Sequence, residues 1–210
     1  GLLTIPMMLG SFVGSAGSGQ LITRYGKWKR YLVSGGILLL GGLLILGTID
    51  HATPYWLVGL GMLALGLGTG MTMQNLVLAV QNTVDVTQIG ASSATVAFFR
   101  SLGGAVGVSA LGAVLATRVK DLIVAGVLAG PNGAEAARKL QEGGSGTSLL
   151  DVNHLPPQLA ELVRHAYGDA TGRIFLIAAA CAVVSLVAVV FIKEVPLRKT
   201  VAKVDVAEDL

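Results

Sequence analysis

The sequence RYGKWKR, at positions 24–30, places four basic and two aromatic residues between two long stretches that carry almost no charge. Basic residues interleaved with aromatic ones can hold single-stranded nucleic acid, or they can anchor a short loop at a membrane interface. The flanking sequence favours the membrane, because residues 1–23 and 30–49 are each long and apolar enough to cross a bilayer.

The composition of the whole chain supports this interpretation. Hydrophobic residues make up 53% of the 210 residues and charged residues only 13%, which is about half the charged fraction of a soluble domain. Only three formal charges fall between positions 30 and 118: Asp50, Asp85 and Arg100. The net charge of +3 therefore belongs to loops, and no nucleic-acid partner is predicted because no basic stripe continues from the turn.

Five stretches qualify as membrane-spanning helices. A span needs about 20 apolar residues, and its backbone has to be hydrogen-bonded internally in lipid, so each stretch is predicted to be helical. The predicted fold class is therefore an all-α polytopic membrane protein. Gly1 already lies in an apolar run, which favours a piece of a longer protein. The five predicted spans are 1–23, 30–49, 54–78, 92–117 and 171–192.

The distribution of basic residues predicts an orientation in the membrane. Lys and Arg gather in the turn at 24–30 and in the tail at 193–210, and both fall on one side of the bilayer if that side is the cytoplasm. Tyr25 and Trp28 are then expected at the depth of the lipid headgroups. The predicted organisation, in chain order, is four spans within 1–117, a long extracytoplasmic segment over 118–170, a last span over 171–192 and a cytoplasmic tail over 193–210.

The predicted extracytoplasmic segment contains one amphipathic stretch, PPQLAELVRHAYGD, near 157–168. Its prolines suit a first helical turn, and its apolar residues recur at helical spacing. This pattern predicts an amphipathic helix on the outer leaflet or over the ends of the spanning helices. The residues on the apolar face are Leu159, Leu162, Val163, Ala166 and Tyr167.

Glycine is abundant within the predicted spans, and several glycines are four residues apart. This spacing lets two helix backbones approach closely in a membrane. The glycine-rich GLGTG at 66–70 lacks the strand-to-helix context of a nucleotide-binding loop, so close helix packing is the preferred interpretation. The pairs are Gly10 and Gly14, Gly66 and Gly70, and Gly103 and Gly107.

No catalytic or metal-binding pattern is evident. His154 and His165 have acidic neighbours but no paired spacing such as H-E-x-x-H, so no metal site is expected. Cys181 is the only cysteine and is interpreted as a small buried hydrophobe. The chain is predicted not to be an enzyme and to need no cofactor.

Polar residues interrupt the third and fourth predicted spans. Gln74 and Asn75 are expected to face either a partner helix or a wet cavity, and the sequence does not separate the two. Arg100 would lie about 13 Å into its helix, where a cation marks a functional or network position. Asp85 is either its partner or a cap of the fourth helix. The substrate-cavity candidates are Met71, Gln74, Asn75, Phe99 and Arg100.

Three stretches together resemble the C-terminal helical bundle of major facilitator superfamily (MFS) exporters: GLLTIPMMLGSFVGSAGSGQLITRYGKWKR, GLGMLALGLGTGMTMQNLVLAVQNTV and IGASSATVAFFRSLGGAVGVSALGAVLATRV. Within that superfamily the chain is similar to the fourteen-helix drug:proton antiporters of the EmrB/QacA type, as their last five helices. The resemblance implies multidrug efflux across the bacterial cytoplasmic (inner) membrane, with the C-terminus in the cytoplasm and the proton gradient as the energy source.

The resemblance also implies roles for particular residues. GQLITRYGKWKR is similar to the superfamily's loop between paired helices, which implies gating by Gly19, Arg24, Gly26 and Lys27, although the acidic residue of that pattern is absent. FFRSLGGAVGV is similar to a glycine-rich helix at the interface between the two halves of such exporters. The predicted helix-packing residues are Gly66, Gly70, Gly103, Gly104 and Gly107.

The same resemblance implies partners: the lipid bilayer, small amphipathic substrates, N-terminal helices of the same transporter and a periplasmic adaptor protein. None of the five predicted spans contains an Asp or Glu in its apolar body, so proton-coupling carboxylates are expected in the N-terminal helices. Two alternatives stay open at this point. The cargo could be a siderophore, an amino acid or a lipid, and the chain could be a membrane scaffold that transports nothing.

Overall fold

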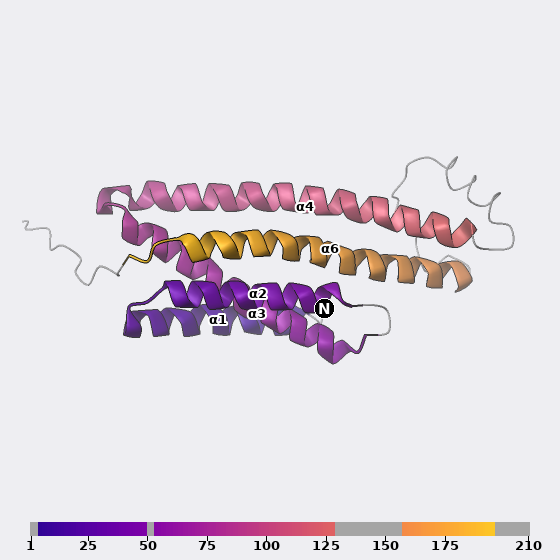
Figure 1. The fold of residues 1–210 in the computed structure, drawn as a ribbon, viewed down its shortest axis with the longest axis horizontal. Helices are drawn as coiled ribbons and strands as arrows, with labels where there is room; N and C mark the ends of the chain where they lie inside the picture. Colours follow the sequence, from indigo (N-terminus) through magenta and orange to yellow (C-terminus); the bar gives the residue numbers. More distant parts are fainter. Residues whose placement is uncertain (1–3, 50–52, 129–156, 196–210) are drawn as a thin grey trace, which may run out of the picture.

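The computed structural model describes residues 4–49, 53–128 and 157–195, and within these ranges it contains helices and no strand (Figure 1). The all-α fold class predicted from the sequence is confirmed. The glycine-rich part of the predicted extracytoplasmic segment, His154 and the tail beyond 195 lie outside the described residues. The elements are α1 (Thr4–Tyr25), α2 (Lys29–Gly47), α3 (Tyr55–Thr83), the short 3-10 helix η1 (Val86–Gln88), α4 (Ile89–Leu128) and α6 (Pro157–Phe191).

Three segments in the described part of the chain are long and apolar enough to cross a membrane: α2, α3 and residues Glu161–Phe191 of α6. The 19 residues of α2 extend about 28 Å at 1.5 Å per residue, which matches the roughly 30 Å of a hydrocarbon core. For α1, which is rich in glycine and serine, and for α4, which contains Arg100, a membrane crossing stays a prediction from the sequence.

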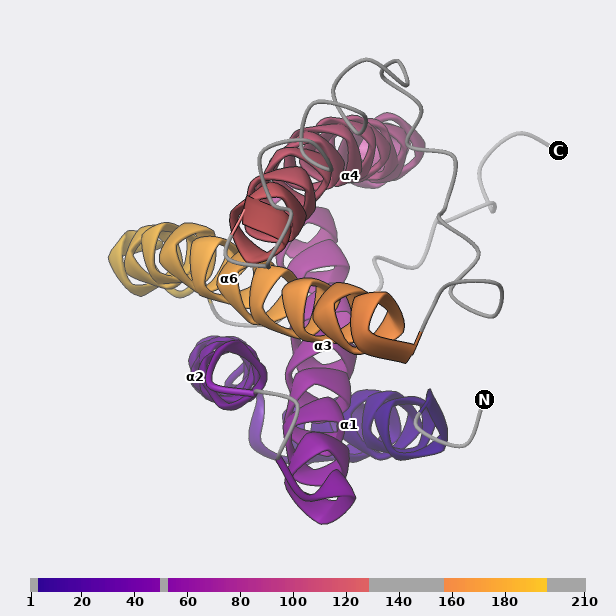
Figure 2. The same ribbon diagram turned by 90° about the vertical axis from the view of Figure 1, so that its right-hand side faces the viewer.

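α3 lies at the centre of the bundle (Figure 2). It packs extensively against α1 on one side and against α2 on the other, whereas α1 and α2 barely touch each other. α6 lies along α2, and α4 contacts mainly α6, with a smaller contact to α3. The position of α3 between α1 and α2 therefore organises the N-terminal part of the fold.

Glycine allows the close contact between α1 and α3. A Cβ atom added at Gly66 would strike the backbone of Met7, and one added at Gly70 would strike the backbone of Ser11. From the other side, a Cβ at Gly10 would lie 2.6 Å from a backbone oxygen of α3, closer than real Cβ contacts. Backbone-to-backbone packing of this kind is how small residues four apart join helices in a membrane.

Three glycines of α4, Gly103, Gly104 and Gly107, behave differently. Within the described residues nothing lies within 4 Å of a Cβ atom added at Gly103, Gly104 or Gly107. These three glycines therefore have no close helix neighbour in the described part of the chain. Their predicted role in packing against other helices stays a prediction.

Trp28, which the sequence predicts at the depth of the lipid headgroups, is a core residue of the bundle. Its side chain is 1% exposed and packs in one apolar cluster with Ile22, Leu32 and Ala79. Tyr25, at the end of α1, is 60% exposed. Of the two aromatic residues in the turn, Tyr25 alone is therefore placed on the surface of the bundle.

Gly26 explains why the chain turns inward at this point. Its φ of 70° lies in the left-handed region, which a residue without a Cβ adopts freely. Its N–H donates to the carbonyl oxygen of Ile22 at 2.7 Å, which is the usual way for a glycine to end a helix. The turn brings Trp28 under the end of α1 and starts α2 at Lys29.

The residues that follow α6 fasten the same end of the bundle. The backbone N–H of Lys29 donates to Glu194 Oε1 at 3.3 Å, and its Nζ donates to the Val190 carbonyl at 2.8 Å. The Val195 carbonyl accepts from the Trp28 indole Nε1 at 2.9 Å and from Asn82 Nδ2 at 3.3 Å. These bonds, which we call the terminal clasp, join the α1–α2 turn, the end of α3 and the end of α6.

α4 and α6 continue well beyond the predicted spans. α4 runs through position 118 to Leu128, and α6 is one helix from Pro157, so the amphipathic helix predicted near 157–168 is the first part of the last spanning helix. With 40 and 35 residues, the two helices measure about 60 and 52 Å. Both extend past the other helices at the end opposite the terminal clasp (Figure 1).

A second apolar cluster stabilises these extensions. It consists of Val119 and Ile123 of α4 with Val163, Ala166 and Ala170 of α6. The apolar face predicted for the amphipathic stretch therefore contacts α4 instead of the outer leaflet. The continuous apolar run ends near 117, but the helical spacing of apolar residues does not, so the helix continues into the charged region.

Replacing Gly70 by alanine is expected to destabilise the protein by about 1–3 kcal/mol, because the added methyl group would force α1 away from α3. Gly59, which also lies in α3 but has nothing within 4 Å of an added Cβ, is the matched control. Gly59→Ala should be neutral or slightly stabilising, since alanine favours helix. Thermal unfolding of the detergent-purified protein measures both, and equal effects of the two variants would contradict the packing role.

Replacing Trp28 by phenylalanine is expected to lower stability by about 1–2 kcal/mol, because it removes the indole donor and part of a buried ring. It should also make the chain after Val195 more accessible to protease. Trp56, 69% exposed, provides the control variant Trp56→Phe, which should change neither. Protease sensitivity equal to wild type in Trp28→Phe would show that the terminal clasp does not hold the tail.

Candidate functional site

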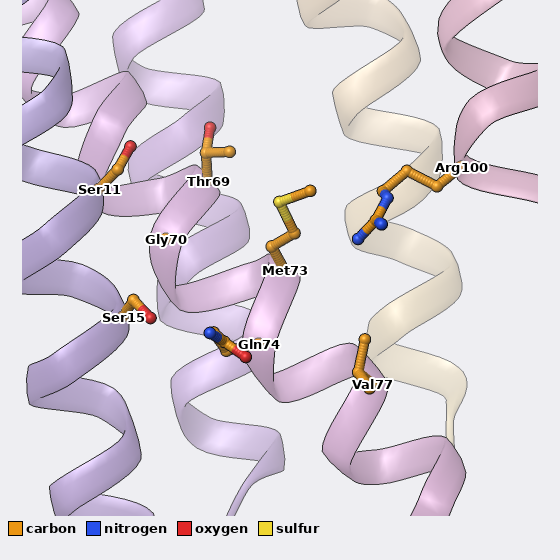
Figure 3. Close-up of a pocket in the computed structure, with 8 residues that line it drawn as sticks. All are labelled: Ser11, Ser15, Thr69, Gly70, Met73, Gln74, Val77 and Arg100. Atoms are coloured by element: carbon orange, nitrogen blue, oxygen red, sulfur yellow. The ribbon is translucent and has the colours of Figure 1, made fainter. Parts of the chain in front are cut away.

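A pocket of about 340 Å³ opens between α1, α3 and α4. Figure 3 shows its lining, with the α1 hydroxyls on one side, the residues of α3 in the middle and Arg100 reaching across from α4. Most of the polar groups come from α1 and α3. The lining residues are Ser11, Ser15, Thr69, Gly70, Met73, Gln74, Val77 and Arg100.

A second pocket, of about 730 Å³, lies between α3 and α4 and shares Met73, Val77 and Arg100 with the first. Its lining is mostly aliphatic and aromatic. The more polar first pocket and the more apolar second pocket thus share these three residues, an arrangement that suits an amphipathic ligand. The residues found only in the second pocket are Leu76, Val80, Ser92, Thr95, Val96 and Phe99.

The pockets exist because α4 is held mainly near its two ends. Near its start, Gln81 Nε2 of α3 donates to Ser93 Oγ of α4 at 2.9 Å. Towards its far end, Val119 and Ile123 pack against α6. Between these attachments α4 stands away from α3, and the side chains of both helices face the space between them.

Gln74 and Arg100 lie at similar depth in the bundle. Gln74 is nine residues before the end of α3 at Thr83, and Arg100 is eleven residues after the start of α4 at Ile89. At 1.5 Å per residue these positions are about 14 and 16 Å from the same end. With α4 crossing the membrane as predicted from the sequence, both side chains are expected near the middle of a hydrocarbon core of roughly 30 Å.

Arg100 has no counter-charge in the described part of the chain. Its side chain is exposed to the pockets and makes no hydrogen bond or ion pair with any described residue. Asp85 was expected either to pair with Arg100 or to cap a helix. It precedes η1, but its side chain makes no capping hydrogen bond and pairs with no described cation. No Asp or Glu occurs in α1, α2 or α3. The described lining of the first pocket therefore contains no carboxylate.

The structure divides the five predicted cavity residues into two groups. Gln74, Phe99 and Arg100 line the pockets. Met71 instead faces α2, where a Cβ added at Gly35 would lie 2.8 Å from its own Cβ. Asn75 is 1% exposed, so it too belongs to the interior of the bundle and not to a pocket wall.

Met71 and Met73 both suit either a cavity or the core from the sequence alone, and Met73 is the methionine that lines both pockets. One face of α3 lines the first pocket and can be followed by its helical spacing. The residues on this face are Gly66, Gly70, Met73, Gln74 and Val77. That spacing is visible in the sequence. What the sequence leaves open is which face of the helix turns to the pocket.

The four predicted gating residues lie at or near the end of the bundle that holds the terminal clasp. An added Cβ at Gly19 would meet nothing within 4 Å, and Gly26 ends α1. The Arg24 guanidinium lies 5.9 Å from the centre of the Tyr25 ring, a cation–π distance. A gating role for these residues and for Lys27 stays a prediction.

Two further expectations concern reactive side chains. Among the described residues, no group of three or more His, Cys, Asp and Glu side chains could hold a metal ion. Cys181, expected to be buried, is a free thiol on the exposed surface of α6. A surface position in an apolar helix suits contact with lipid or with another helix.

Comparison with known proteins identifies transporters. An uncharacterized MFS-type transporter of Mycobacterium tuberculosis is 31% identical over 197 residues, which are 94% of this chain and 27% of that protein. The aspyridones efflux protein of Neocamarosporium betae is 31% identical over 195 residues, 92% of this chain and 33% of its own length. The multidrug transporter protein MdtP of Bacillus subtilis is 34% identical over 123 residues, 59% of this chain and 23% of its own.

The chain is similar to MFS-type transporters and efflux pumps. No protein-family model matches it, and it spans between 23% and 33% of the length of these three relatives. Together with the apolar helices, the relatives make it a multi-pass membrane protein. They are transporters and not enzymes, in agreement with the sequence-based prediction.

Asn75 is buried and its amide nitrogen Nδ2 has no hydrogen-bond partner. Burying an unpaired donor costs about 1–3 kcal/mol, so Asn75→Leu, which keeps the side-chain size, is expected to leave stability unchanged or to raise it by up to that amount. The neighbouring Gln74 is exposed, and Gln74→Leu should not change stability. Thermal unfolding measures both. A loss of more than about 1 kcal/mol in Asn75→Leu would mean that the amide has a partner in the folded protein.

Proposed function

We propose that this chain is the C-terminal bundle of an MFS exporter of the fourteen-helix drug:proton antiporter group. It would move drugs or other amphipathic toxic compounds out of the cell across the bacterial cytoplasmic membrane. The observation that carries the proposal is the pair of connected pockets at Met73, Val77 and Arg100, which join a polar and an apolar compartment near mid-depth of the bundle. The efflux proteins among its relatives support the same activity.

In this proposal the two pockets divide the recognition of one ligand. The apolar body of a substrate packs against Phe99, Val96 and Leu76, where Met73 adapts to different shapes because a thioether side chain is flexible and polarizable. The polar part meets Gln74 and the hydroxyl of Ser15. A large apolar wall with only a few hydrogen-bonding groups lets ligands of varied structure bind, and a multidrug exporter needs this property.

The exposed apolar surface supports a further set of helices as partners. Phe12 of α1 is 74% exposed and Val108 of α4 is 75% exposed, and both helices border the pockets. Gly103, Gly104 and Gly107, which have no described neighbour within 4 Å of an added Cβ, lie on the same helix as Val108. N-terminal helices of the transporter would cover this surface and close the pockets, and lipid or a periplasmic adaptor would meet other surfaces.

Proton coupling is assigned to the same N-terminal helices. α1, α2 and α3 contain no carboxylate, and a residue that gains and loses a proton within the membrane is usually Asp, Glu or His. The loop at 24–30, fastened by the terminal clasp, would lie in the cytoplasm together with the end of α6. Alternating exposure of the pockets then requires this bundle to rock against the other half.

The test is export by the full-length transporter, expressed from its natural start codon. Cells that produce it should accumulate less of a fluorescent amphipathic dye, and a protonophore should abolish the difference. Gln74→Ala should raise dye accumulation by weakening binding, with a loss of about three- to ten-fold in apparent affinity for one neutral hydrogen bond.

The control is Gln88→Ala, because Gln88 is an exposed glutamine in η1 outside both pockets. It should export the dye like the wild type at equal protein level. Export that resists the protonophore would refute proton coupling. Absence of export for every compound tested would favour the alternative of a membrane scaffold, and export of siderophores, amino acids or lipids alone would change the cargo.

A further inference from the structure

Arg100 is the residue of the pockets whose chemistry the proposed function does not yet use. It lines both compartments and stands where they meet. Its guanidinium has five donors in a fixed plane and stays protonated, so it favours carboxylates, sulfonates and phosphates. A cation in this position decides which polar groups a ligand can carry.

The surroundings of Arg100 leave its charge uncompensated. In the described residues it has no ion-pair partner, and Asp121, the first acidic residue after it in α4, is 21 residues further along the helix. That separation corresponds to roughly 31 Å. No carboxylate is among the described residues that line either pocket, so this part of the lining does not attract a cationic ligand.

The neighbouring polar groups complement an anion as well. The hydroxyls of Ser11 and Ser15 and the amide of Gln74 line the polar pocket on the side facing Arg100 (Figure 3), and each can donate a hydrogen bond. The Thr69 hydroxyl is already used, since it donates to the Leu65 carbonyl at 2.8 Å. These hydroxyl and amide groups can therefore donate to an anion that Arg100 holds.

We infer that the two pockets select amphipathic compounds that carry an anionic group, with the anion bound by Arg100 and the apolar body packed against Phe99 and Val96. The inference rests on the proposed export function and adds the substrate class. A charge near mid-depth of the membrane is costly to leave unpaired, so binding of an anion replaces an uncompensated cation by a pair. A neutral compound of the same shape gains only the apolar contacts.

The experiment compares two fluorescent dyes that share one skeleton. The anionic dye is 1-anilinonaphthalene-8-sulfonate, and the neutral dye is N-phenyl-1-naphthylamine, which lacks the sulfonate. Uptake is measured in energised inverted vesicles that contain the full-length transporter, with protonophore-treated vesicles as the background. Binding to the purified transporter is measured by dye fluorescence. The variants are Arg100→Gln, Arg100→Lys and Arg118→Gln.

The expected result is a loss specific to the anion. Arg100→Gln should weaken binding and uptake of the sulfonate by about ten- to hundred-fold, the effect of one hydrogen bond to a charged group, and leave the neutral dye unchanged. Arg100→Lys should retain part of the sulfonate binding because it keeps the charge. Arg118, exposed on α4 outside both pockets, is the control, and Arg118→Gln should bind both dyes like the wild type.

Other outcomes separate this inference from the proposed function. Uptake of the neutral dye alone, or equal loss of both dyes in Arg100→Gln, would overturn anion selection while export stands, and equal loss would assign Arg100 to a partner in the remaining helices. If vesicles take up neither dye, the export proposal fails for these compounds. The binding measurement still decides the inference: sulfonate binding that depends on Arg100 supports it, and binding that does not depend on Arg100 refutes it.

Discussion

The backbone contact between α1 and α3 determines how the rest of the bundle is arranged. Gly66 and Gly70 turn one face of α3 to α1, and Gly68 turns another face to α2, where a Cβ would lie 2.7 Å from the Gly35 carbonyl oxygen. With two faces committed to such close contacts, α3 cannot rotate about its axis. Met73 and Gln74 continue the face of Gly66 and Gly70 further along α3, and there they line the pockets. Residues without side chains thus determine where the functional side chains point.

The pockets also depend on the length of α4 and α6. Each helix extends past the membrane-sized helices, and the apolar cluster around Val119 and Val163 joins them there. Because this attachment lies far from Arg100, α4 is positioned without filling the space beside α3. If α4 ended before Val119, its far end would need contacts nearer the middle of the helix, and those contacts would fill part of the pockets.

Local chemistry in the sequence was sufficient to predict the helices and the close contact of α1 with α3. Gln74 and Arg100, both predicted as cavity residues, line one pocket, and their role in a site stays a prediction. Local chemistry was insufficient where a distant segment decides the outcome. Met71 and Met73 have similar neighbours in the sequence. Only the packing of α2 on α3 shows that Met71 faces α2 and that Met73 faces the pockets. Trp28 was interpreted as an interface residue because the acceptor of its indole N–H, the Val195 carbonyl, lies 167 residues away in the sequence. Local sequence does not indicate such a partner. The ends of α4 and α6 were misplaced because charge ends a hydropathic run without ending a helix.

The bond between Trp28 and Val195 has a consequence for the order in which the protein is made. Ribosomes add about 5–20 residues per second, so the hairpin of α1 and α2 is synthesised on the order of ten seconds or more before its acceptor exists. Through this interval the indole N–H can be satisfied only by water or by the translocation machinery. The turn between α1 and α2 therefore reaches its final structure only after α6 has been synthesised and inserted.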